Sequence, residues 1–102
     1  MSKAYYPKAD NKTQNFTKAY KGSKQSPNVL VIHSTEGTSW PGYGGGGSAP
    51  HMTIMPDFKN KKVIVRQHFP ADVSARALAN KSGGVETNTL NVFQIELVGT
   101  CD

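Results

Sequence analysis

Glu96 is the carboxylate of this sequence whose surroundings best suit acid–base chemistry. It lies in the apolar run 92–98, where the alternation of a strand places it on one face with Gln94 and Val98. Burial of a carboxylate disfavours its charged form and raises its pKa toward the range of a general acid or base at neutral pH. We therefore expect Glu96 to be catalytic; the alternative is an edge strand on which it faces water.

His33 is the candidate metal ligand. It ends the apolar run 29–33 and is followed by the polar segment 34–37. A histidine at a strand end that opens into a loop lies where open α/β sheets bind ligands. The alternative is a partly buried histidine that only makes hydrogen bonds. His51 and His68 make no i, i+4 pair with His33 or with each other, which excludes a helical zinc motif of the HExxH kind.

Trp40 and Tyr43 precede the glycine run 44–47 and are candidates for lining a glycan cleft, or for anchoring the loop by packing. The glycines resemble a phosphate-binding loop only superficially, because Ser48 follows where such a loop requires lysine. Four successive glycines lose much conformational entropy on ordering, so we expect a loop rather than a helix. Cys101 is the single cysteine, which excludes an intramolecular disulfide.

The net charge of +5 is confined to the beginning of the chain. Residues 1–35 hold six lysines and one acidic residue, whereas residues 36–102 hold six basic and six acidic residues. All sixteen Val, Leu and Ile residues lie from residue 29 to residue 98. We therefore expect a basic arm over residues 1–27, loosely ordered and pinned by its aromatic residues or else contacting a polyanion. Residues 28–102 would form the single folded unit.

Hydrophobic patterning predicts the elements that position these side chains. Strands are expected over 29–33, 51–55, 62–68 and 91–98, the first of them buried on both faces. Residues 58–61 would be a hairpin turn, with Pro56 ending the second strand, and residues 72–79 a short helix. The predicted class is α/β: a mixed, mostly central sheet of about four strands with short helices.

The sequence contains no apolar run of the roughly 18–20 residues that a membrane span requires. Its first residues lack the apolar region of a secretory signal. We therefore expect synthesis in a cytoplasm, with any export by another route.

Four segments, in this order, resemble the zinc-dependent N-acetylmuramoyl-L-alanine amidases of the type-2 amidase and peptidoglycan-recognition superfamily. They are VLVIHSTEG at 29–37, SAPHMTI at 48–54, VIVRQHF at 63–69 and NTLNVFQIELVG at 88–99. The residue sequence of these segments is most similar to amidase domains of endolysins from actinobacterial phages. Segments 40–47 and 74–78 share that similarity.

The resemblance implies a role for several residues. His33 matches the first zinc ligand, and Glu96 matches the glutamate with the acid–base role. His51 matches a histidine that is not a usual ligand, and with Trp40 and Tyr43 it would contact substrate. The implied substrate is bacterial peptidoglycan and the implied cofactor is Zn²⁺. Two positions depart from the family: Pro50 replaces a frequent tyrosine, and Arg76 replaces a frequent histidine.

The largest departure is that the family's other zinc ligands follow the glutamate strand, whereas this sequence ends at Asp102. The resemblance therefore implies the N-terminal part of an incomplete amidase-type domain, inactive unless a C-terminal segment or second chain completes it. Such an enzyme would be made in the host cytoplasm and would act at the cell wall after release by lysis or a holin route. The alternative function is a non-catalytic wall-binding module. Nucleic-acid binding is disfavoured, because the arm has no arginine and no known motif.

Overall fold

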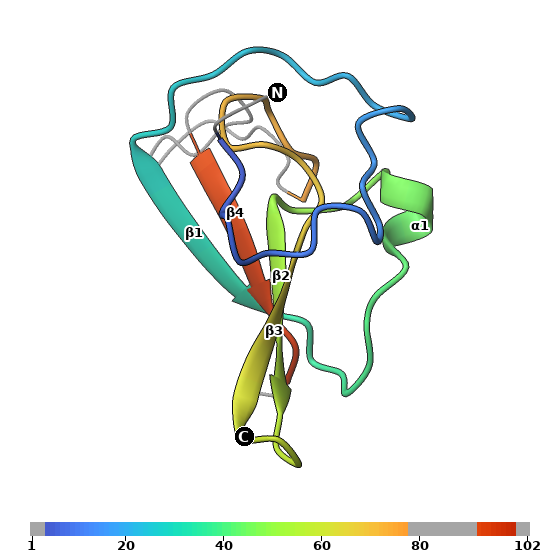
Figure 1. Ribbon diagram of the computed structural model, residues 1–102. Helices are drawn as coiled ribbons and strands as arrows, with labels where there is room; N and C mark the ends of the chain where they lie inside the picture. Colours follow the sequence, from blue (N-terminus) through green and yellow to red (C-terminus); the bar gives the residue numbers. More distant parts are fainter. Residues whose placement is uncertain (1–3, 78–91, 100–102) are drawn as a thin grey trace.

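The computed structural model describes residues 4–77 and 92–99 of the 102-residue chain (Figure 1). A four-stranded mixed sheet dominates it, with strand order β1-β4-β2-β3. β1 and β4 are parallel, β4 and β2 are parallel, and β2 and β3 are antiparallel. The elements are β1 (Val29–Ser34), α1 (Tyr43–Gly46), β2 (Met52–Asp57), β3 (Lys62–Gln67) and β4 (Val92–Leu97).

The predicted sheet is confirmed, and so is the hairpin of β2 and β3 with its turn at residues 58–61. The prediction that Pro56 ends the second strand was wrong. Pro56 pairs with Val63, and β2 continues to Asp57. β4 pairs with β2 along Met52 to Ile54, so within residues 4–77 and 92–99 no strand pairs with β2 on that side at Pro56. A proline that lacks an N–H is tolerated at such an edge position.

The predicted helix at 72–79 was also wrong over residues 72–77, which form turns and a bridge; residues 78–79 lie outside the described ranges. The backbone groups that a helix would use internally are bonded to the arm. The Gln25 N–H donates to the Asp72 carbonyl at 2.8 Å, and the Ser74 N–H donates to the Ser23 carbonyl at 2.7 Å. Tertiary pairing therefore overrides the local helix signal.

α1 falls in the glycine-rich stretch expected to be a loop, so that expectation was wrong in detail. The element is a single turn of four residues. Gly44 (φ 59°) and Gly45 (φ 75°) inside it have left-handed backbone conformations. These are conformations that glycine adopts without the steric penalty of a Cβ atom, so the run forms a tight turn rather than a regular helix.

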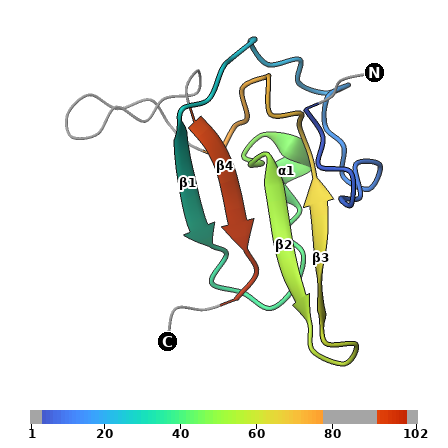
Figure 2. The same ribbon diagram turned by 60° about the vertical axis from the view of Figure 1, so that its left-hand side comes forward.

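The two faces of the sheet differ in cover. α1 lies behind β2 in Figure 2, which looks onto the other, open face. The apolar cluster on the α1 side joins Tyr43 to Ala49, Phe69 and Ala75, with Phe16, Tyr20 and Val73 packed against it. On the open face Leu30 and Ile32 are each 56% exposed. The expectation that the first strand is buried on both faces was therefore wrong.

The basic arm lies against this body. Asp10 forms a bridge with Arg66 of β3, and Lys24 forms one with Val73. Two of the arm's aromatic residues, Phe16 and Tyr20, pack against the core cluster, as expected of a pinned arm. The boundary at residue 27 stays a prediction. No helix among the described residues is long and apolar enough to span a membrane.

Candidate functional site

One row of polar side chains crosses all four strands. The register pairs His33 of β1 with Glu96 of β4, Glu96 with Thr53 of β2, and Thr53 with Arg66 of β3. Directly paired residues project from the same face of a sheet. The structure therefore brings together the two residues predicted from the sequence, His33 and Glu96, and adds Thr53 and Arg66 to them.

Glu96 occupies the centre of this row. β4 lies between β1 and β2, so the edge-strand alternative was wrong. The Glu96 side chain is half-buried, and this burial raises the pKa of its carboxyl, while the nearby His33 partly opposes the rise. The predicted direction of the pKa shift is thus confirmed. A carboxyl with a raised pKa can both accept and donate a proton closer to neutral pH.

Thr53 connects the row to a chain of hydrogen bonds beneath it. Its Oγ1 lies 2.6 Å from the Tyr43 hydroxyl and 2.8 Å from Nε2 of His68. Nδ1 of His68 lies 2.9 Å from the Gln14 carbonyl, which can only accept, so Nδ1 carries the proton of the neutral ring. It follows that Nε2 accepts from the Thr53 hydroxyl and that the Tyr43 hydroxyl donates to Thr53.

Burial keeps the ends of this chain neutral. Desolvation raises the pKa of Tyr43 to about 12; the hydrogen bond between Tyr43 and Thr53 opposes this rise and the charge of Glu96 adds to it. Desolvation likewise lowers the pKa of His68. Thr53 and His68 are fully buried. A neutral chain of fixed direction holds Thr53 rigidly beside Glu96.

Trp40 lies at the β3 end of the row. The Arg66 guanidinium carbon is 3.8 Å from the centre of the Trp40 ring, a cation–π contact. Nη1 of Arg66 also donates to Oε1 of Gln14 at 3.3 Å. Trp40 is half-buried and leaves part of its ring accessible, whereas the Tyr43 ring is buried and directs its hydroxyl at Thr53. Of these two predicted substrate contacts, Trp40 is the accessible one.

His51 lies outside the row and is fully buried. The Gln94 N–H donates to its Nδ1 at 3.0 Å, so its Nε2–H donates to the Val73 carbonyl at 2.7 Å. Its ring packs against Phe93 at 4.9 Å between centroids. Contact with a substrate would require this ring to leave its buried position, and the structure instead gives it a role in joining β4 to the segment at Val73.

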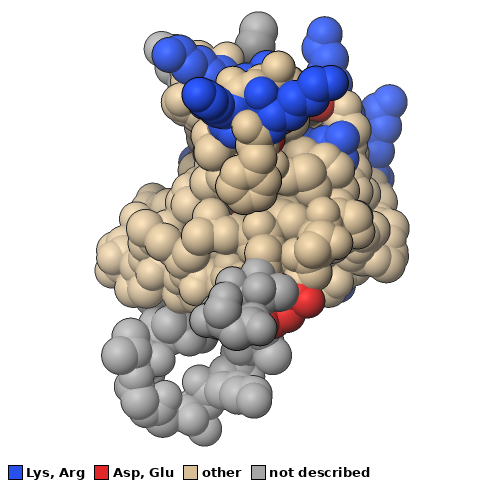
Figure 3. Space-filling view, turned by 90° about the horizontal axis from the view of Figure 1, so that it is seen from below, with Lys and Arg blue, Asp and Glu red and all other residues tan. Residues whose placement is uncertain are grey.

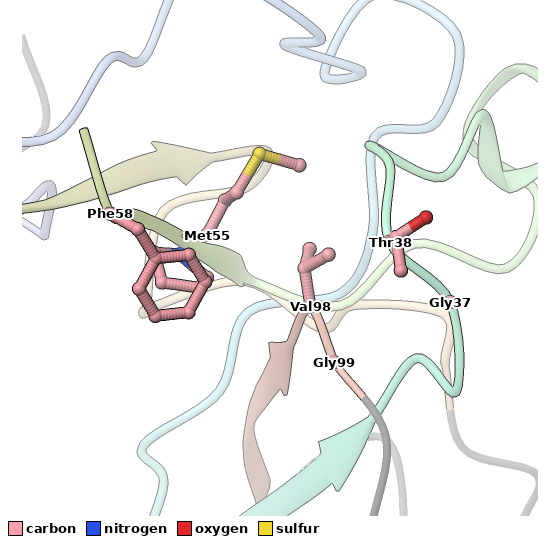
Figure 4. Close-up of a pocket in the computed structure, with 7 residues that line it drawn as sticks. Gly37, Thr38, Met55, Phe58, Val98 and Gly99 are labelled. Carbon is pink, nitrogen blue, oxygen red and sulfur yellow. The ribbon is translucent and has the colours of Figure 1, made fainter.

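An open pocket of about 560 Å³ adjoins the polar row. Val98 and Met55 follow Glu96 and Thr53 by two residues and so continue the same side of the sheet. Figure 4 shows Val98 between Phe58 and Met55 on one side and Thr38 on the other. The residues that line the pocket are Gly37, Thr38, Met55, Pro56, Phe58, Val98 and Gly99.

The fit of a zinc ion to these residues is partial. His33 is exposed at the row and Glu96 is its neighbour, so an imidazole and a carboxylate are available. A catalytic zinc uses three protein ligands and one open position. Residues 4–77 and 92–99 contain no group of three His, Cys, Asp or Glu side chains that could hold a metal. His33 therefore fits one ligand position, and the described residues do not complete the set.

Sequence reasoning missed Thr53 and His68. Thr53 alternates with apolar residues in the second strand, and a hydroxyl at an inward position was the available signal. His68 was recognised only as one of three histidines, since nothing local reveals its bond to a residue fifteen positions earlier.

Neither family models, nor curated proteins, nor solved structures give a match to this chain. The amidase resemblance thus depends on the sequence motifs alone.

Proposed function

We propose that this chain is part of a peptidoglycan hydrolase of the phage endolysin type, which cleaves the amide between N-acetylmuramic acid and L-alanine. The observation that carries the proposal is the placement of Glu96 between His33 and Thr53 in one row of the sheet. The motif resemblance supplies the substrate class, since the geometry alone describes a half-buried acid–base group beside an imidazole.

Glu96 performs the proton transfers in this proposal. Its carboxylate accepts a proton from the attacking water and passes it to the nitrogen of the leaving L-alanine. The raised pKa favours that return step, because a carboxyl that holds its proton more tightly is still protonated when the amine departs. Thr53 is the β2 residue paired with Glu96, and its hydrogen bonds to Tyr43 and His68 hold it in place beside the carboxylate. The accessible part of the Trp40 ring offers an apolar surface to a sugar.

His33 supplies the metal-ligand position. A Zn²⁺ ion held there in the complete enzyme would supply a Lewis acid for the scissile carbonyl. Its remaining protein ligands come from outside the described residues, either from a C-terminal segment or from a second chain. The proposed site of action is the bacterial cell wall, reached from the host cytoplasm through lysis or a holin route.

The test compares Glu96→Gln with Asp57→Asn, a change of an acidic residue at the end of β2 and outside the polar row. Both are made in the chain carrying whatever its reading frame encodes after Asp102. We expect Glu96→Gln to lower the release of peptide N-termini from purified walls on the order of a hundredfold or more, with zinc content unchanged. Asp57→Asn should behave as the parent. A zinc-loaded parent that frees no peptide N-terminus would refute the enzyme.

A second candidate is a non-catalytic wall-binding module. The observation that favours it is the set of exposed lysines of the arm: Lys8, Lys12, Lys18, Lys21 and Lys24. Attraction of these cations to anionic wall polymers is screened by salt, so retention on purified walls should fall between low and high ionic strength. Absence of retention at both would exclude this candidate.

A further inference from the structure

The turn between β2 and β3 displays an aromatic side chain to solvent. Phe58 is 86% exposed, and Val63 at the start of β3 is 61% exposed. Both line an open hollow of about 510 Å³, together with Pro56, Asp57, Lys61 and Lys62. Two exposed apolar side chains on one turn offer a surface that can contact another phase or molecule.

The conformation of the turn is fixed by its own side chains. The Asp57 carboxylate accepts from the Asn60 backbone N–H at 3.3 Å and from the Asn60 side-chain amide at 2.8 Å. The Asn60 side-chain hydrogen bond is also the main reason why the pKa of Asp57 is lowered. Lys61 completes the turn with a left-handed backbone, φ 53°. The exposure of Phe58 is therefore built into an organised turn.

Three lysines follow this aromatic residue within four positions of the sequence. Lys59, Lys61 and Lys62 are all exposed, against the single carboxylate of Asp57. Figure 3 views the molecule from the end at which this turn lies in Figure 1, and Lys and Arg side chains gather on one part of that view. The turn thus combines an apolar side chain with a local excess of positive charge, and the complementary partner is anionic.

The basic arm has a different character. Its lysines are spread along residues 8–24, and Phe16 and Tyr20 point into the core cluster. Tyr6 is its aromatic residue with substantial exposure, 44%, and Lys8 lies two positions away. Charge alone attracts the arm to any polyanion, whereas the turn also offers apolar surface to insert.

We propose that the β2–β3 turn docks on an anionic lipid bilayer, with Phe58 entering the boundary between headgroups and acyl chains. Lys59, Lys61 and Lys62 contact the lipid phosphates, and Val63 extends the apolar surface behind the ring. Aromatic residues favour this interface, and lysines near it are attracted to anionic headgroups. A nucleic acid would use several aromatic platforms for stacking, and the turn has one. This proposal does not rest on the proposed hydrolase activity, although Phe58 also lines the pocket beside the polar row.

The first test is sedimentation of the full chain with vesicles of phosphatidylcholine alone or mixed with phosphatidylglycerol. We expect binding to the anionic vesicles that decreases with salt. Replacement of Lys59, Lys61 and Lys62 by Gln should weaken it about a hundredfold, and Phe58→Ser about tenfold. The matched control replaces Lys8, Lys18 and Lys21 by Gln; it removes the same charge from the arm and should weaken binding much less. Equal losses from the two triple variants, or no effect of Phe58→Ser, would overturn the proposal.

The second test reports depth. The parent contains one tryptophan, Trp40, so Phe58→Trp adds a single fluorophore at the turn. With anionic vesicles containing brominated acyl chains, emission of the Phe58→Trp variant should be quenched and that of the parent should not. Binding without quenching, or equal binding to an oligonucleotide of similar charge, would show a purely electrostatic contact and refute insertion.

Discussion

The covered and open faces of the sheet differ in chemistry as well as in exposure. The covered side holds a polar row and fully buried polar side chains, of which Thr53, His68 and Gln94 are examples. The open face carries Leu30, Ile32 and Leu97, each more than 40% exposed. The arm covers this face at one place, the Gln67 side chain, which forms hydrogen bonds with the backbone of Ala4 and Tyr6. The covered side of the sheet is therefore distinguished from the open face by its buried, hydrogen-bonded polar side chains more than by the amount of apolar surface it buries.

The largest expected difference is in unfolding free energy, between a side-chain truncation on the covered side and one on the open face. Phe69→Ala removes a fully buried ring from the core cluster and should lower the free energy of unfolding by about 3–5 kcal/mol. Leu30→Ala on the open face should lower it by less than about 1 kcal/mol, because that side chain is already mostly in water. Urea denaturation measures both. Similar losses from the two variants would mean that the open face is buried in solution.

A smaller expected loss of stability tests how tightly the α1 turn packs against Phe16 on the covered side of the sheet. A Cβ at Gly46 would lie 2.6 Å from Cγ of Phe16 at a φ of +108°, so Gly46→Ala should cost about 2–4 kcal/mol of unfolding free energy. Gly44 has a φ of +59° and no neighbour within 4 Å of such a Cβ. Gly44→Ala should therefore cost only the backbone penalty, about 1–2 kcal/mol. Equal thermal stability of the two variants would show that Phe16 leaves its place.

The smallest effect is the pH dependence of stability. Burial lowers the pKa of His51 and His68 in the folded chain, so the unfolded chain binds protons more readily. Stability should therefore decrease as pH falls below about 6.5, by at most about 1.4 kcal/mol per pH unit for each histidine. Glu96 acts in the opposite sense above about 4.5, because its raised pKa makes the folded chain the better proton binder as pH rises.

Urea midpoints from pH 5 to 8 measure this dependence. His68→Gln should remove about half of the acid-side slope, since His51 remains. A stability that is flat between pH 5 and 7 would show that the two rings titrate normally and are accessible, and the contrast between the faces would fail.

The sequence predicted what depends on local patterning. Alternation along residues 92–98 placed Glu96 with Gln94, and the turn residues 58–61 predicted the hairpin; both are confirmed. It could not identify the covered face of β1, because Leu30 and Val31 are equally apolar although they face opposite sides. Nor could it predict the segment 72–77, whose capping signal is local whereas its partners at Ser23 and Gln25 are about fifty residues distant.

Asp10 gives the arm an additional consequence. Its N–H donates to the Val65 carbonyl and its carbonyl accepts from the Gln67 N–H, each at 2.8 Å. Those two groups belong to the outer edge of β3, where an unpaired strand would be a template for another chain. By occupying these groups, the arm prevents β3 from pairing with the edge strand of another chain, in addition to supplying positive charge. Its detachment would expose β3 to self-assembly, and it would also remove the Gln14 contacts with His68 and Arg66.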